Sequence, residues 1–209
     1  NIQMYTGGFK EAGDEDGIAL EEKLKEVAER GGLRILGPNC MGIHVPAYRN
    51  TTWITFDPTP GPVAMIAQSG GHAGQFVFDA PRHGIYLSKV ISYGTAAVLD
   101  STDLLEYLAT DMDTEIICMY IEGVKDGTKL TKIIKEINKT KPVIIWKGGS
   151  TASGARTAAS HTGSLGGELA VWDAFFKQTG AVRADSGDEL LDIAMTFRYL
   201  RPMGGNRIA

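Results

Sequence analysis

Apolar residues recur in short runs along residues 61–209, and polar segments of helical length separate these runs. The runs are apolar without alternation, which is typical of parallel strands whose two faces are both covered. The pattern predicts an α/β fold with a parallel five-stranded sheet, flavodoxin-like in arrangement, and with helices between the strands. The predicted strands centre near Met65, Val90, Cys118, Ile145 and Val182.

The first block of the chain, residues 1–56, predicts a single strand–helix–strand unit. Leu20, Leu24 and Val27 fall on one helical face, which predicts an amphipathic helix that packs through that face. We expect this block to be the C-terminal part of a Rossmann-like α/β domain whose earlier part precedes residue 1. A proline-dense segment follows it and predicts a domain boundary, so that the second domain spans residues 61–209.

The composition is that of an ordinary globular protein, with 43% hydrophobic and 22% charged residues and a net charge of -4. No basic patch stands out, which argues against a nucleic-acid partner. The two cysteines do not make a disulfide framework, and no apolar run is long enough to span a bilayer. We therefore expect a cytoplasmic protein that binds neither membranes nor nucleic acids. No spacing typical of a zinc site is present, so no metal ligands are predicted.

A segment of small and hydroxyl residues at 151–167 carries one imidazole, that of His161. It follows a predicted strand and precedes a predicted helix, and open α/β sheets bind ligands at that end of their strands. The small neighbours leave room for a side chain that receives a phosphoryl group and moves between sites. We interpret His161 as a nucleophile; the alternative is a surface or packed histidine. His72, in another glycine-rich loop, is its rival.

Two further loops carry candidate chemistry. Ser69, Gly70 and Gly71 follow a predicted strand, and their backbone N–H groups can approach an anion at the start of the next helix. The alternative for this loop is a tight turn that needs small residues for packing. Glu122 directly follows another apolar run, where its carboxylate can accept the N–H of an imidazole and fix the tautomer. The alternative is a solvated loop acid.

These motifs resemble those of the nucleoside-diphosphate-forming acyl-CoA synthetases, which include the succinyl-CoA synthetase alpha subunit and the ADP-forming acetyl-CoA synthetases. The resemblance spans nearly the whole chain, and the ADP-forming branch fits better than succinyl-CoA synthetase itself. Residues 68–71 are similar to the family's phosphate loop, and residues 160–165 are similar to its phosphohistidine loop. Residues 6–11 and 37–43 resemble the close of its CoA-binding domain.

The resemblance assigns roles to residues at the matching positions. It implies that His161 is phosphorylated and that Glu122 orients it. It further implies a site for the phosphoryl group and a contact surface for CoA. The implied phosphate-binding residues are Ser69, Gly70, Gly71 and Gly163, and the implied CoA-binding residues are Tyr5, Thr6, Gly7, Asn39 and Cys40.

The implied activity is that of an acid–CoA ligase. It interconverts acyl-CoA, phosphate and ADP or GDP with a small organic acid, CoA and ATP or GTP, through an acyl phosphate and a phosphohistidine. CoA and the nucleotide with Mg²⁺ are the implied cofactors, and the nucleotide is bound mainly by an ATP-grasp part that this sequence lacks. We expect that part as a partner subunit or fused domain, an oligomeric protein, and no turnover by this piece alone.

Two other functions fit the same fold. One is a CoA- or acyl-CoA-binding regulatory module, such as the related domain fused to protein acetyltransferases. The other is a plain flavodoxin-like interaction domain. The regulatory class, by resemblance, lacks the phosphorylatable histidine, and an interaction domain needs no glycine-rich histidine loop. His161 together with Glu122 therefore favours the enzyme.

Overall fold

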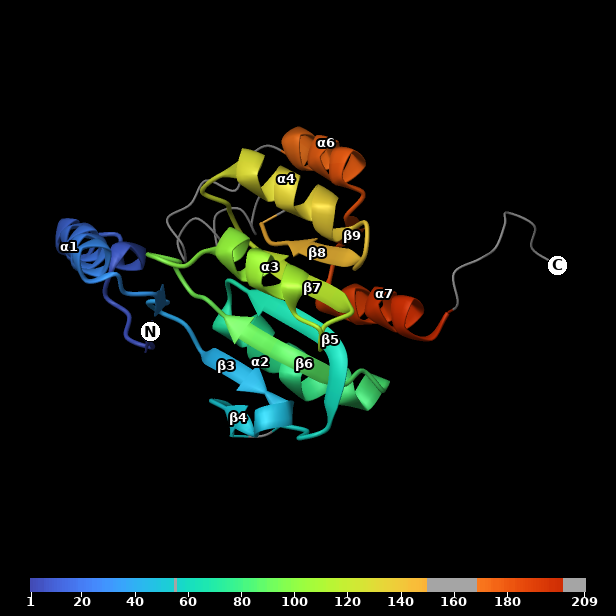
Figure 1. Cartoon of the computed structure of the whole chain (residues 1–209). Helices are drawn as coiled ribbons and strands as arrows, with labels where there is room; N and C mark the ends of the chain where they lie inside the picture. Colours follow the sequence, from blue (N-terminus) through green and yellow to red (C-terminus); the bar gives the residue numbers. More distant parts are fainter. Residues whose placement is uncertain (55, 150–168, 201–209) are drawn as a thin grey trace.

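A seven-stranded sheet in the order β4-β3-β6-β5-β7-β8-β9 forms the centre of the structure, a computed structural model that describes residues 1–54, 56–149 and 169–200 (Figure 1). Five of its strands are parallel, and their order is that of the flavodoxin-like fold, so the predicted fold is confirmed. The parallel strands are β5 (Pro60–Ala67), β6 (Leu87–Ser92), β7 (Ile116–Ile121), β8 (Val143–Lys147) and β9 (Val182–Ala184).

The register of the parallel strands places the predicted strand centres beside one another. Met65 of β5 pairs with Val90 of β6 on one side and with Cys118 of β7 on the other. Cys118 in turn pairs with Ile144 of β8, which pairs with Val182 of β9. The strands therefore end at a common edge, and the loops that follow them lie close together.

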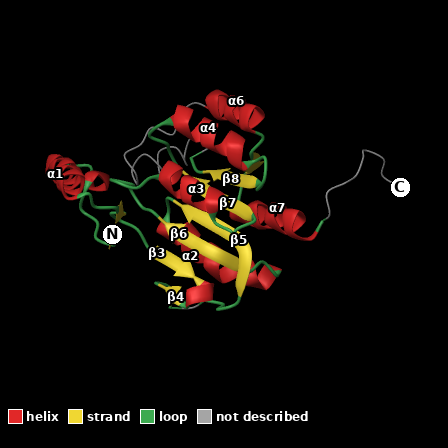
Figure 2. Cartoon of the chain, viewed as in Figure 1, coloured by secondary structure: helices red, strands yellow, loops and turns green. Residues whose placement is uncertain are grey.

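Helices cover both faces of the sheet, which explains why the strands are apolar without alternation (Figure 2). On one face, Ile66 and Met119 are buried under helices α3, α4 and α6. On the other face, Met65 and Cys118 are buried under α2 and α7. The helices are α2 (Gly70–Asp79), α3 (Ser101–Thr110), α4 (Gly127–Ile137), α6 (Leu169–Thr179) and α7 (Gly187–Tyr199).

Two short antiparallel strands, β3 (Gly42–Val45) and β4 (Asn50–Thr51), extend the sheet beyond β6. The sequence pattern did not predict them, because a two- to four-residue strand carries too little periodicity to be recognised. Both lie on the N-terminal side of the predicted domain boundary, so the sheet draws strands from both blocks of the chain. The division into residues 1–56 and 61–209 stays a prediction.

The first block contains the predicted strand–helix–strand unit. Strands β1 (Ile2–Gln3) and β2 (Ile35–Leu36) pair in parallel, and α1 (Glu15–Gly31) connects them. The predicted packing face of α1 was wrong, because Leu20 is 48% exposed and Val27 is 39% exposed. The turn before α1 instead covers the side of the helix that carries Gly17. There an added Cβ on Gly17 would lie 2.3 Å from the carbonyl oxygen of Phe9.

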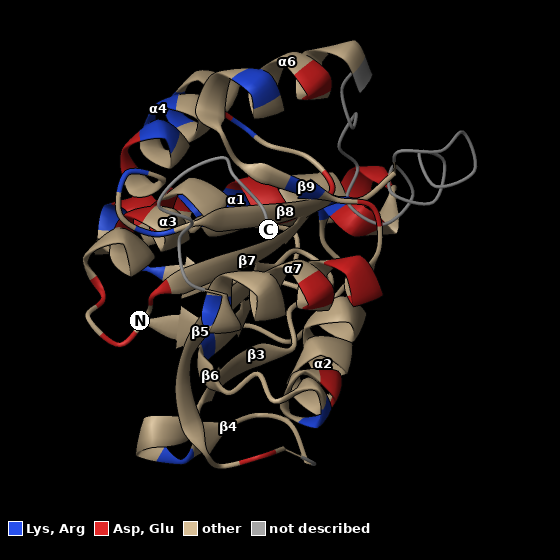
Figure 3. Cartoon of the chain, turned by 90° about the vertical axis from the view of Figure 1, so that its right-hand side faces the viewer, with Lys and Arg blue, Asp and Glu red and all other residues tan. Residues whose placement is uncertain are grey.

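Many of the charged residues belong to the helices, where Figure 3 marks their positions along the ribbon. Helix α4 exposes Lys132 and Lys135, whereas α7, on the other face of the sheet, exposes Asp188, Glu189 and Asp192. Among the helices that the structure describes, none combines the length and the apolar character needed to cross a membrane.

His44 of β3 is a buried imidazole, only 1% exposed, whose ring centroid lies 5.3 Å from that of Phe56. Neither ring nitrogen has a hydrogen-bond partner within the described parts of the chain. Burial lowers the pKa of His44, and the negative charge of Asp57 opposes that shift only in part. The folded protein therefore holds this histidine in the neutral form.

We expect the free energy of unfolding to fall as the pH drops below about 6.5, the ordinary pKa of histidine. The unfolded chain then binds a proton that folded His44 resists, and stability decreases wherever the unfolded state binds more protons on acidification. His72, whose pKa burial also lowers, adds to the effect in the same direction. Urea unfolding between pH 5 and pH 8 checks this. His44→Leu should flatten the pH dependence, and an unchanged slope would refute the assignment.

Candidate active site

The carboxyl ends of four parallel strands meet at the edge of the sheet that faces the first block (Figure 1). Gln68 and Ser69 follow β5, Tyr93 follows β6, Glu122 follows β7 and Gly148 follows β8. The backbone N–H of Gln68 donates to the carbonyl oxygen of Tyr120 at 3.1 Å, and the backbone N–H of Tyr93 donates to that of Ala67 at 2.9 Å. The loops after these strands therefore form one hydrogen-bonded group.

The predicted phosphate turn begins helix α2. Ser69 is the N-cap residue, and its Oγ accepts a hydrogen bond from the backbone N–H of His72 at 3.4 Å. An added Cβ on Gly70 would lie 2.2 Å from Cγ of Met41, so this position needs glycine for packing. Among the described residues, an added Cβ on Gly71 would contact only Ser69 Oγ, at 3.8 Å, so they leave the backbone there open. No acidic residue lies in the first turn, which leaves the helix N-terminus suited to an anion.

Glu122 is buried, at 5% exposure, and is therefore not a solvated loop acid. The hydroxyl of Tyr120 donates to its Oε1 at 3.1 Å. Burial raises the pKa of Tyr120, and the charge of Glu122 raises it further, so the phenol keeps the proton that it donates. An added Cβ on Gly148 would lie 2.4 Å from the Tyr120 hydroxyl and 3.2 Å from Cγ of Glu122. The carboxylate is therefore confined by its neighbours.

Lys147, at the end of β8, brings a buried cation to the same edge. It is 6% exposed, and its Nζ donates to the carbonyl oxygen of Gly148. Burial lowers the pKa of Lys147, and the negative charge of Glu122 opposes that shift. The Nζ atom also lies 5.3 Å from the ring centroid of Trp172. The edge thus combines a carboxylate, a phenol and an ammonium group in a protein interior.

His72, the rival of His161, is packed between aromatic rings. Its ring centroid lies 4.2 Å from that of Tyr120 and 4.4 Å from that of Trp146. Burial lowers its pKa. These contacts fit a histidine that packs against the sheet, in contrast to a side chain that must move between two sites.

The residues predicted to contact CoA come together in the first block. The backbone N–H of Asn39 donates to the carbonyl oxygen of Thr6 at 3.0 Å, and an added Cβ on Gly7 would lie 4.0 Å from Oδ1 of Asn39. Tyr5 is 53% exposed, whereas Cys40 is buried and its Sγ donates to the carbonyl oxygen of Met4 at 3.3 Å. Burial raises the pKa of the Cys40 thiol. Cys40 is therefore a packed residue of this loop.

This loop is joined directly to the candidate edge of the sheet. The carbonyl oxygen of Pro38 accepts from the backbone N–H of Thr95 at 3.1 Å, and Ser92 Oγ accepts from that of Met41 at 3.0 Å. Gly94 has a φ of 59°, and an added Cβ there would lie 2.1 Å from the Pro38 carbonyl oxygen. Because Met41 also packs on Gly70, the candidate CoA residues and the candidate phosphate turn are neighbours.

His161 and Gly163 lie outside the described residues, as does all of the predicted phosphohistidine loop. Their proximity to Glu122 and to the Ser69 turn therefore stays a prediction. Among the described residues, no group of His, Cys, Asp and Glu side chains could hold a metal ion.

Residues 60–197 match the family described as the succinyl-CoA ligase like flavodoxin domain. The chain belongs to this family. The matched segment of the succinyl-CoA ligase-like domain begins with β5 and ends within α7, so it includes the candidate phosphate turn and Glu122. The predicted resemblance is confirmed at the level of the family.

The succinyl-CoA ligase-like chain is 43% identical over 202 residues to ADP-forming acetate–CoA ligase I of Archaeoglobus fulgidus, covering 96% of this chain and 29% of that protein. It is 44% identical over 209 residues to the alpha subunit of ADP-forming acetate–CoA ligase II of Pyrococcus furiosus, covering 100% and 45%. Dinucleotide-forming acetyl-CoA synthetase 1 of Ca. Korarchaeum cryptofilum, in complex with phosphate and ADP, has a similar structure. The TM-score is 0.89 at 33% identity, over 98% of this chain and 44% of that one. The chain thus spans less than half the length of these relatives.

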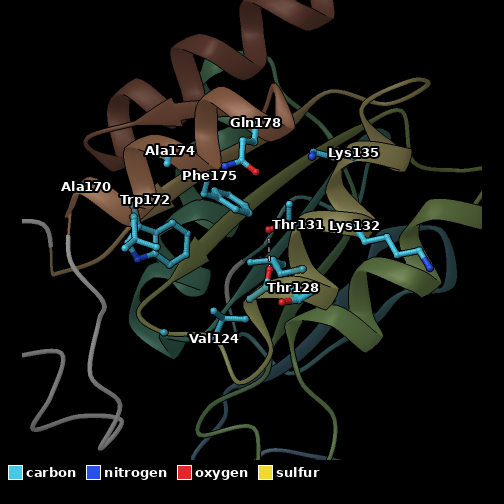
Figure 4. A pocket seen from close by; sticks show the side chains of 14 residues that line it. Val124, Thr128, Thr131, Lys132, Lys135, Ala170, Trp172, Ala174, Phe175 and Gln178 are labelled. Atoms are coloured by element: carbon cyan, nitrogen blue, oxygen red, sulfur yellow. Dashed lines mark hydrogen bonds between the residues drawn. The ribbon is translucent and has the colours of Figure 1, made fainter.

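A groove of about 1010 Å³ lies beside the candidate site, between α4 and α6 (Figure 4). Figure 4 shows Trp172 and Phe175 of α6 on one side and Thr128 and Thr131 of α4 on the other. Neither Ser69 nor Glu122 lines this groove, although Gly123 does. A smaller cavity of about 110 Å³ lies between the two blocks, and its lining includes Lys10, Lys25, Gln68, Tyr93 and Lys125.

Proposed function

We propose that this chain is the CoA-binding and phosphoryl-carrying part of an ADP-forming acid–CoA ligase. The phosphoryl group is carried on His161, Glu122 orients the imidazole, and the Ser69, Gly70 and Gly71 turn binds the phosphoryl oxygens together with Gly163. Tyr5, Thr6, Gly7, Asn39 and Cys40 form part of the CoA site. The acid is a small carboxylic acid, as in the acetate ligases that the chain is similar to.

One observation carries the proposal: the first-block loop, the phosphate turn and a buried carboxylate meet at one edge of the sheet. Met41, which directly follows Cys40, packs on Gly70, and Gln68 joins the turn to Glu122. A thioester bound by the first block would thus have its reactive end beside a helix N-terminus that favours phosphate. A bare interaction domain needs neither the buried acid nor this open turn.

The chemistry consists of two displacements at phosphorus after one at carbon. A phosphate oxygen attacks the acyl carbon of acyl-CoA, and the C–S bond breaks to give acyl phosphate and CoA. A nitrogen of His161 attacks phosphorus, and the P–O bond to the acyl group breaks, which releases the carboxylate. An ADP oxygen then attacks the same phosphorus, the P–N bond breaks, and ATP and neutral histidine result. The histidine splits one difficult transfer into two steps, and backbone N–H groups stabilise the charge on the phosphoryl oxygens.

The nucleotide and its Mg²⁺ belong, in this proposal, to an ATP-grasp part beyond this chain. The Pyrococcus relative is called an alpha subunit, whereas the Archaeoglobus relative is a longer chain of which the match covers 29%. The ATP-grasp part can therefore be a partner subunit or a fused domain, and either fits a chain that binds CoA and carries the phosphoryl group. We propose that the protein acts in the cytoplasm as an oligomer, where its two free cysteines stay reduced.

Site mapping tests the proposal. The full-length protein with its nucleotide-binding part is incubated with γ-labelled ATP and Mg²⁺ and digested with trypsin at alkaline pH. The four histidines fall in different tryptic peptides, namely 35–49, 50–82, 83–89 and 157–177. We expect an acid-labile, base-stable phosphate on peptide 157–177, which contains His161. Label on peptide 50–82 would instead identify His72, and CoA binding without any label would indicate the regulatory module.

A further inference from the structure

Gln68 is the residue through which the phosphate turn and the acid loop touch. It is 8% exposed, and its side-chain Oε1 accepts from the backbone N–H of Glu122 at 2.8 Å and from that of Gly123 at 3.2 Å. Of the two ends of the side-chain amide, the oxygen accepts hydrogen bonds and the NH₂ group donates them, so these two N–H donors fix which way the amide points. The amide side chain thus replaces the backbone hydrogen bonds that β7 loses where it ends.

The same residue is continuous with the phosphate turn. Gln68 immediately precedes Ser69, the N-cap of α2, and its own N–H donates to Tyr120. Tyr120 in turn donates to the Glu122 carboxylate. Gln68 therefore bonds to the backbone before Glu122, at Tyr120, and to the backbone N–H groups of Glu122 and Gly123.

We propose that Gln68 is a positioning residue that fixes the Glu122 carboxylate relative to the α2 N-terminus, a proposal that rests on the function given above. In this role Gln68 acts through Glu122 and needs no contact of its own with the reacting atoms. A buried carboxylate that orients an imidazole needs a fixed backbone, because a displacement of the carboxylate by about 1 Å greatly lowers the rate of the reaction at the imidazole. Gln68 directly precedes the phosphate turn, so one short segment fixes the positions of both the turn and the Glu122 carboxylate.

A double-mutant cycle tests the proposal, with the rate of phosphohistidine formation in the full-length protein as the readout. We expect Glu122→Gln to slow this rate by about 100-fold, because the neutral amide no longer favours the tautomer required. Gln68→Met removes the acceptor for both N–H groups and should slow the rate by about 10- to 100-fold. If Gln68 acts through Glu122, the double variant is no slower than Glu122→Gln. A double variant whose rate is reduced by the product of the two single reductions would overturn the proposal, because the two residues would then act independently.

Gln68→Glu gives an independent readout that does not depend on how well Gln68→Met folds. The new carboxylate keeps the two hydrogen bonds but adds a like charge, which raises the pKa of Glu122 and of an imidazole that it orients. We expect the acidic limb of the pH–rate profile to move to higher pH, with the rate at alkaline pH close to that of the wild type. An unmoved profile would show that the side chain at position 68 does not act on Glu122, and that result would refute the proposal.

Gln75→Met is the matched control, because Gln75 lies exposed on α2, the helix that follows Gln68, and bonds only to Asp79 among the described residues. Its rate and pH profile should equal those of the wild type. A wild-type protein that takes up no phosphate would overturn the proposed function and this inference together. Two results would overturn only the role of Gln68, provided that the wild type takes up phosphate. One is independent, multiplying effects of the two single substitutions, and the other is an unchanged pH–rate profile for Gln68→Glu.

Discussion

Replacing His161 with Ala is expected to reduce phosphate incorporation from ATP to background, a fall of at least roughly 10³-fold. Alanine offers no nitrogen to bond to phosphorus, and both displacements at phosphorus need that nitrogen, as the nucleophile in one and as the leaving group in the other. Incorporation is measured as acid-labile, base-stable phosphate per mole of full-length protein. The reverse assay, which forms acyl-CoA from acid, CoA and ATP, should stop as well. Binding of CoA should persist, because the candidate CoA residues lie in the first block.

His72→Phe is the matched control for that loss. Phenylalanine keeps a ring between Tyr120 and Trp146, where the imidazole of His72 now packs, but it cannot carry phosphate. His83→Ala, at an exposed position outside the candidate site, controls for a general effect of losing a histidine. Both variants should incorporate phosphate as the wild type does. Retained incorporation in His161→Ala together with its loss in His72→Phe would reverse the assignment of the two histidines.

The sheet was predictable from sequence because burial on both faces leaves a strong and simple signal. Five apolar runs are needed for five covered strands, and their spacing leaves room for a helix after each of the first four. The position of Glu122 was predictable for the same reason, since a residue directly after a buried strand must lie at the sheet edge. Its burial was not, because burial depends on Tyr120 and Gly148, which approach only once the strands pair.

The contacts of Gln68 and Lys147 were missed for a related physical reason. Gln68 directly follows a buried strand and Lys147 ends one, and a sequence does not distinguish a polar residue that is buried and bonded there from one that faces solvent. Gln68 reaches a partner 54 positions away, at Glu122, which local periodicity cannot reveal. A polar residue at the last position of an apolar run was the available signal. The packing face of α1 was predicted wrongly for a different reason: amphipathicity shows that one side of a helix is apolar but does not show whether another part of the chain covers it.

The largest effect on stability is expected at the other end of the sheet, for Lys89→Met. Lys89 of β6 is buried, and its Nζ lies 2.7 Å from Oδ2 of Asp111, whose side chain is 10% exposed. Removing one partner of a buried ion pair leaves an uncompensated charge and costs about 3–5 kcal/mol. The nearby Lys141 donates to the backbone carbonyl oxygen of Asp111 at 2.6 Å, so its charge offsets that of the orphaned carboxylate only in part. Urea unfolding at neutral pH measures the loss.

Lys139→Met provides the matched comparison, because Lys139 pairs with Glu136 on the surface, where both side chains are 65% exposed. Surface pairs contribute only about 0–1 kcal/mol. The variant Lys89→Met, Asp111→Asn should recover part of the stability lost in Lys89→Met, since it removes the orphaned charge. Equal losses for Lys89→Met and Lys139→Met would refute the burial argument. Phosphate incorporation should be unchanged in folded Lys89→Met, because the pair lies away from the candidate site.

The pH dependence of this pair has a definite sign. Burial disfavours the Asp111 carboxylate, but hydrogen bonds from Lys89 and Thr114 outweigh that cost, so the pKa of Asp111 lies below its ordinary value. The stability that the pair contributes is therefore complete above about pH 4, the ordinary pKa of aspartate, and is lost as the pH falls through the lower folded value. Lys89→Met and the wild type should differ most at neutral pH and converge in strong acid. A difference that stays constant down to that range would mean that the methionine acts through packing and that the Asp111 charge is not its cause.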